Sequence, residues 1–276
     1  MQKKTIGLIL NIEAVINRII YNFSMIGSYK KYNYLTKSDI TFYSVIVFSA
    51  LMLCLKEYFG KASIFHRFLD SPKSSLQYKW AKLLFDGEMS SLYSLLFWAA
   101  SCVLFYLILP SIFRKIISPQ APSLFKFKVP INHWKIYGLM LLIMIIPLVF
   151  ASFLPSFQHM YPFVYIPRSQ DWYRILLYWE IGYLFQFVAV EFFFRGFLLF
   201  AFEKEMGYKA VLIPLIPYVM IHFGKPLPET IGAIIAGLIL GTMAIRSKSI
   251  IPGVCVHFCI ALGMDILSLW HQGYFI

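Results

Sequence analysis

Seven apolar stretches divide this chain of 276 residues, and charged side chains are scarce within them. A helix needs about 20 apolar residues to cross the roughly 30 Å hydrocarbon layer of a membrane. The stretches approach or exceed this length, and 59% of the chain is hydrophobic against 14% charged, which is unusual for a soluble globular protein. The predicted spans are Ile40–Leu55, Met89–Phe113, Trp134–Leu154, Tyr173–Phe202, Tyr208–Phe223, Thr230–Ile245 and Ser249–Trp270. The sequence therefore predicts an all-α, multi-pass transmembrane helix bundle.

The connecting segments indicate how the chain is organised and oriented. Residues 1–130 are expected to hold a surface segment (Thr5–Phe23), two spans and basic loops, and residues 131–276 a membrane core. The net charge of +12 is spread over these loops, so nucleic acid is not a predicted partner. More of the Lys and Arg residues lie in loops on the same side of the membrane as the N-terminus, which predicts that the N-terminus is cytoplasmic. The expected location is the cell membrane, and membrane lipids are expected partners.

The fourth predicted span, WEIGYLFQFVAVEFFFRGFLLF, carries three charged residues through an otherwise apolar stretch. Glu191 and Arg195 are four residues apart, so their side chains lie within about 40° of one another on a helix and can pair. These charges are explained by a buried structural ion pair. They are also explained by a functional site, because charges inside a membrane usually face a cavity or a site. Glu180 lies about 16 Å farther along the helix and is predicted to be interfacial.

Two histidines lie in other apolar stretches. His222 lies near the end of the fifth predicted span, and His257 lies in the seventh. Residue counts place Glu191 and His222 at similar depth, about 18 and 21 Å from one surface, and His257 nearer 12 Å. A lone histidine in an apolar helix is more often structural. A glutamate with two histidines, however, can activate water, either with a general base or through a bound cation.

Three short segments carry a family resemblance. VEFFFRG, YVMIH and HFCIA resemble the core motifs of the CPBP family, which are Glu-Glu-x-x-x-Arg, aromatic-x-x-x-His and His-x-x-x-Asn or Asp. This family of intramembrane endopeptidases includes CAAX-prenyl proteases and bacteriocin-processing or Abi-type immunity proteins. The resemblance covers about Trp179–Trp270, and the first 130 or so residues match only as generic membrane spans.

The resemblance assigns roles residue by residue. It implies that Glu191, His222 and His257 are catalytic, and that Arg195 and Tyr218 support them. Two positions depart from the motifs, because Val190 replaces the first glutamate, the usual water-activating base, and Ala261 replaces the final Asn or Asp. Glu229 and Asp265 are nearby carboxylates that could substitute. Glu229 could equally cap the helix that follows it.

The resemblance implies hydrolysis of a peptide bond near a membrane-embedded or lipidated segment, so the expected partner is a hydrophobic or lipidated peptide. It leaves open a divalent metal such as zinc, with His222 and His257 as its candidate ligands. Two alternatives remain: a catalytically silent immunity or scaffold protein of the same fold, and a small-molecule or ion carrier. The absence of internal repeats disfavours the carrier.

Overall fold

The computed structural model describes residues 37–87, 89–117, 125 and 129–275, and all regular elements in these ranges are helical. The predicted surface segment Thr5–Phe23 lies outside the described residues. Contacts divide the chain into two compact units, Met1–Phe48 and Ser49–Ile276. The predicted all-α class is confirmed. All predicted site residues belong to the second unit, and the division at residue 130 stays a prediction.

Six of the described helical runs are long and apolar enough to cross a membrane. They are Asp39–Phe59, Ser90–Ile117, Ile131–Ser152, Trp172–Met220, Leu227–Ser247 and Ile251–His271. Five of them match predicted spans within a few residues. The fourth run contains both the fourth predicted span and most of the fifth, so the predicted count of seven is only approximate.

The chain turns within this fourth run at Gly207. There α9 (Leu199–Met206) ends and a 3-10 turn, η4 (Gly207–Val211), leads into α10 (Leu212–Met220). Gly207 has φ +56°, a conformation that glycine adopts without steric cost. Because η4 has 5 residues and α10 has 9, the predicted fifth span is not one continuous crossing helix.

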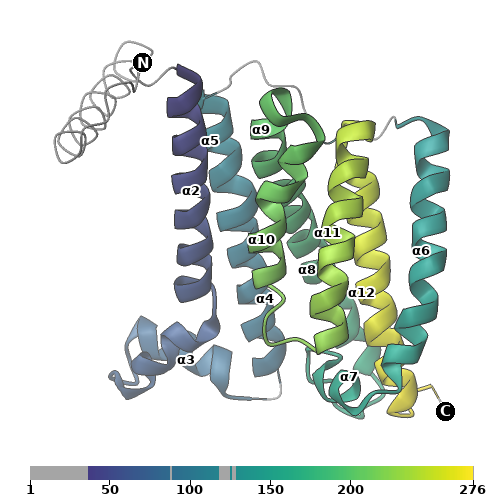
Figure 1. The fold of residues 1–276 in the computed structure, drawn as a ribbon. Coiled ribbons are helices and arrows are strands. Elements are labelled where there is room, and N and C mark those ends of the chain that lie inside the picture. Colours follow the sequence, from purple (N-terminus) through teal and green to yellow (C-terminus); the bar gives the residue numbers. More distant parts are fainter. Residues whose placement is uncertain (1–36, 88, 118–124, 126–128, 276) are drawn as a thin grey trace. The chain divides into compact units, whose positions relative to one another are not determined.

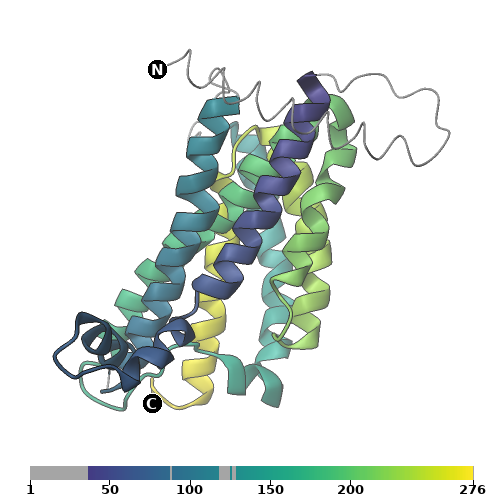
Figure 2. The ribbon, with the colours of Figure 1, turned by 90° about the vertical axis from the view of Figure 1, so that its left-hand side faces the viewer.

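The second unit is built around α8 (Trp172–Glu191), which packs against α4 (Ser90–Cys102) and α12 (Ile251–His271). Figures 1 and 2 show these helices running along one another, with α6 (Ile131–Ser152) against α12 and α10 against α11 (Leu227–Ser247). Within the run that contains α8, 72% of the most apolar segment is buried, against 39% or less in every other described candidate span. The charged fourth span is therefore the core of this unit.

Two π-helical segments interrupt the long helices and pack on each other. One is η2 (Val103–Ile108), between α4 and α5 (Leu109–Ile117), and the other is η3 (Phe192–Leu198), between α8 and α9. Tyr106 of η2 stacks on Phe193 of η3 with 4.7 Å between the ring centroids. Such wider turns are often found at functional sites, and Arg195 lies in η3. The remaining described elements are α2 (Lys37–Phe59), η1 (Ala62–Asp70), α3 (Leu76–Phe85) and α7 (Pro155–Met160).

Candidate active site

Glu191 and Arg195 form a buried ion pair where α8 passes into η3. The Arg195 Nη1 donates to Glu191 Oε1 over 3.0 Å, and the two side chains are only 2% and 1% exposed. This confirms the pairing predicted from their four-residue spacing. Removal of either partner would leave the other charge without compensation in the interior.

His257, on α12, binds the same carboxylate oxygen. Its Nδ1 lies 3.0 Å from Glu191 Oε1. An ionised carboxylate can only accept, so Nδ1 carries the hydrogen and the remaining nitrogen, Nε2, of the neutral ring is an acceptor. The imidazole ring also contacts Phe187, with 4.4 Å between the ring centroids. Glu191 and Phe187 therefore fix the tautomer and orientation of His257.

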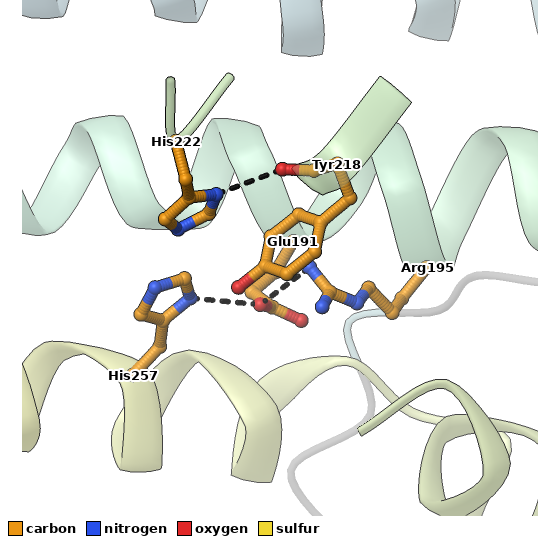
Figure 3. A network of polar contacts seen from close by, with 5 residues as sticks. All are labelled: Glu191, Arg195, Tyr218, His222 and His257. Carbon is orange, nitrogen blue, oxygen red and sulfur yellow. Dashed lines mark hydrogen bonds and ion pairs between the residues drawn. The ribbon is translucent and has the colours of Figure 1, made fainter. Parts of the chain in front are cut away.

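His222 is held in the turn that follows α10. Its Nδ1 donates to the backbone carbonyl of Tyr218 over 2.8 Å, which again leaves Nε2 as an acceptor. Figure 3 shows the imidazoles of His222 and His257 facing each other, although they come from different helical segments. Two oriented Nε2 acceptors thus face the same region.

Tyr218 joins the two halves of this cluster. Its ring lies 3.8 Å from the Cζ of Arg195, a cation–π contact. The ring centroid is 4.8 Å from that of His222 and 6.3 Å from that of His257. Tyr218 is 2% exposed. The aromatic residue of the YVMIH segment therefore supports both histidines and the arginine.

A glycine allows α12 to approach the carboxylate. A Cβ at Gly253 would lie 3.1 Å from Glu191 Oε2, which is tighter than an ordinary van der Waals contact. The sequence pattern did not single out Gly253. A glycine one turn before a motif histidine was the only signal available for it.

The two positions that depart from the family motifs are buried and apolar. Val190 is 2% exposed, and Ala261 is 4% exposed within a hydrophobic cluster that includes Trp179 and Leu269. Neither side chain can donate or accept a proton, so the acid–base capacity of the site rests on Glu191 and the histidines.

Asp265 belongs to a second buried cluster, two helical turns beyond His257 on α12. Its Oδ2 accepts a 2.8 Å hydrogen bond from Trp179 Nε1, and both residues are 0% exposed. Glu180 lies beside Asp265 and is 7% exposed. Glu180 is therefore buried between α8 and α12, and its interfacial depth in the membrane stays a prediction.

Glu229 lies in the first turn of α11 and its carboxylate binds Lys225, at 2.6 Å, and the hydroxyl of Tyr161. Burial and the Glu229 carboxylate raise the pKa of Tyr161, so its hydroxyl stays protonated and donates. These contacts engage Glu229 with partners other than the two imidazoles. Its role as a substitute base stays a prediction.

The donor set bears on the expected metal. A catalytic zinc site usually has three protein ligands, and the part of the chain that the structure describes has no group of three or more His, Cys, Asp or Glu residues placed to hold a metal ion. His222 and His257 offer two nitrogen donors, while Glu191 is engaged by Arg195 and His257. The described residues therefore do not fit a three-ligand site.

Comparisons with known proteins agree with the location of this cluster. A family model described as "Rce1-like: Type II CAAX prenyl endopeptidase Rce1-like" matches residues 171–263. The matched segment contains all five residues drawn in Figure 3. Neither the curated proteins nor the solved structures gave a match.

Proposed function

Through residues 171–263 the chain belongs to the CPBP family, and on this premise we propose that it is an intramembrane endopeptidase. The proposed substrate is a protein or peptide that is cleaved near a membrane-embedded or lipidated segment. The proposed location is the cell membrane, with the N-terminus in the cytoplasm. The matched model describes CAAX prenyl endopeptidases, which supports the reaction class.

The observation that carries the proposal is the hydrogen bond from His257 Nδ1 to Glu191 Oε1. A carboxylate on Nδ1 stabilises the positive charge that the ring acquires when Nε2 takes a proton, so the pair is equipped for general base catalysis. We therefore assign the base to His257 and an orienting role to Glu191. Because Glu191 is 1% exposed, direct contact between its carboxylate and the attacking water is disfavoured.

The proposed reaction needs only water and the substrate. His257 Nε2 removes one proton from a water molecule while the water oxygen bonds to the peptide carbonyl carbon. His222 Nε2 accepts a hydrogen bond from the other O–H of that water and so orients it, without taking the proton. When the carbon–nitrogen bond breaks, Nε2 of His257 returns its proton to the leaving amine.

The direct test uses the purified full-length chain in liposomes. The substrates are a peptide library that includes C-terminal cysteine peptides with and without a prenyl group, and products are identified by mass spectrometry. We expect cleavage by the natural chain and a loss of about 10²-fold or more for His257→Gln, the typical contribution of a general base. Cleavage at the same rate by His257→Gln would contradict the proposal.

A catalytically silent relative is the second candidate, since a specific observation favours it. Val190 and Ala261 are apolar and buried at the two positions where the family motifs carry polar residues. A silent protein would bind a hydrophobic or lipidated segment without cleaving it. In the liposome assay it would retain a labelled peptide but release no product.

A further inference from the structure

A shallow surface cavity of about 510 Å³, widely open to the outside, lies at one end of the second unit, where α6 begins and where α9 and α11 end. Figure 1 shows these three helix ends at the same level of the bundle. The polar residues that line the cavity are His133, Glu203, Tyr208, Arg246 and Lys248. None of them belongs to the Glu191–His257 cluster, and the proposed hydrolysis does not use them.

The charges in the cavity favour an anion. Lys248 is paired with Glu203 at 2.8 Å, so these two charges offset one another. Arg246 is exposed, and within the described residues its guanidinium has no ion pair or hydrogen bond. The dipole of α11 accounts for a cation near the end of this helix, but not for the hollow beside it. A planar guanidinium with free N–H donors is well suited to binding phosphate.

The position of the cavity indicates where such a phosphate would come from. His133 is near the start of the candidate span Ile131–Ser152, and Arg246 is near the end of Leu227–Ser247. The cavity therefore lies at the depth of lipid headgroups, where basic pockets between helices commonly bind anionic lipids. Exposed Lys204 and Lys209 nearby in the chain add positive charge. The predicted orientation puts this end in the cytoplasmic leaflet, whose surface is negative.

We propose that this cavity binds the phosphate of an anionic phospholipid headgroup, with Arg246 as the principal donor and Lys248 as a second cation. Glu203 competes with the phosphate for Lys248. A soluble phosphate offers the same chemistry, but it lacks the acyl chains that would anchor it beside the helices.

The experiment measures thermal stabilisation of the full-length chain in detergent as phosphatidylglycerol, phosphatidylcholine or inorganic phosphate is added. We expect saturable stabilisation by phosphatidylglycerol alone. Arg246→Gln should weaken its apparent affinity about tenfold or more, as expected for loss of charged hydrogen bonds. The matched control Lys204→Gln removes the same charge outside the cavity and should change the affinity by less than about twofold.

Glu203→Gln gives a second test with the opposite sign. Removal of this carboxylate frees Lys248 for the phosphate, so the affinity for phosphatidylglycerol should increase. A site in which the Glu203–Lys248 pair is only structural would show no increase. The proposal is overturned if Glu203→Gln fails to tighten binding, if Lys204→Gln weakens it as much as Arg246→Gln, or if inorganic phosphate stabilises the chain as well as the lipid does.

Discussion

Glu191 and His257 come from α8 and α12 and are joined by a 3.0 Å hydrogen bond between Oε1 and Nδ1. The same oxygen accepts from Arg195, also at 3.0 Å. One carboxylate oxygen thus ties together the arginine, which balances its charge, and the histidine, which it orients. Any change at Glu191 should therefore affect stability and catalysis together.

The first prediction concerns Arg195→Ala. This change leaves Glu191 charged and without its buried partner, which should lower the free energy of unfolding by about 3–5 kcal/mol. Denaturant titration in mixed micelles gives the value. Arg174→Ala is the control, because Arg174 pairs with Asp171 at the surface with both side chains 62% exposed, and its loss should leave the melting temperature nearly unchanged. Equal melting temperatures for the two variants would contradict a stabilising role for the Arg195 pair.

The second prediction concerns the close approach at Gly253. The Cβ of Gly253→Ala would lie 3.1 Å from Glu191 Oε2, so α12 or the carboxylate has to shift. We expect a cost of about 1–3 kcal/mol, the usual range for overpacking, and a weaker bond between Glu191 and His257. In Gly263→Ala, on the same helix, the Cβ meets the end of the Leu148 side chain at the same 3.1 Å distance.

Because the Leu148 side chain can move aside, Gly263→Ala should be neutral or stabilising in the same thermal unfolding experiment. If Gly253→Ala proves as stable as Gly263→Ala, the contact with Glu191 does not constrain the helix.

The third prediction concerns Asp265 and Trp179. Asp265→Asn keeps an oxygen that can accept from Trp179 Nε1 and removes one of two neighbouring buried carboxyl groups, so stability should be unchanged or higher. Asp265→Ala strands the indole N–H and should cost about 1–3 kcal/mol more than Asp265→Asn. Thermal unfolding of both variants, each with Trp179 and with Trp179→Phe, completes a double-mutant cycle. The difference in stability between Asp265→Asn and Asp265→Ala should largely disappear in the Trp179→Phe background, where the indole N–H is absent.

Much of the fold could be predicted from the sequence, because apolar length is a strong signal. Predicted spans such as Trp134–Leu154 fall on helices such as α6. The fifth span was less accurate, since its residues are divided between the short η4 and the nine-residue α10 and do not form one long helix. Hydropathy reports apolar content but cannot show where a helix ends within an apolar stretch.

The cluster could be predicted only in part. The spacing of Glu191 and Arg195 predicted their ion pair, and depth estimates placed His222 and His257 near them. The contact of Nδ1 of His257 with Glu191 was not predictable, because it depends on how close α12 approaches α8 near Gly253, where a Cβ would lie 3.1 Å from Glu191 Oε2. The position of Asp265 beside Glu180 was not predictable for a similar reason, since one sequence does not reveal which residues of two helices lie side by side.

The last prediction distinguishes the catalytic roles of the Glu191 and Glu229 carboxylates in one proteolysis assay. If His257 is the base and Glu191 orients it, Glu191→Gln should lower kcat by about 10²-fold or more, as loss of general base catalysis does. Glu229→Gln should keep activity within a few-fold, because the Glu229 carboxylate is bound to Lys225 and Tyr161. KM should change little in either variant if neither residue binds the substrate directly.

Other outcomes of this assay would identify a different arrangement. If Glu229→Gln loses as much activity as His257→Gln, Glu229 is the substitute for the base missing at Val190, and the assignment to His257 is wrong. Full activity in both Glu191→Gln and Glu229→Gln would exclude these two carboxylates from the acid–base chemistry. Val190→Glu provides the remaining comparison, because it restores the family glutamate at a position that is 2% exposed. Cleavage that appears only in Val190→Glu would mean that the natural chain is a silent relative, whose apolar Val190 removed the base while the Glu191–Arg195–His257 contacts were kept for structure.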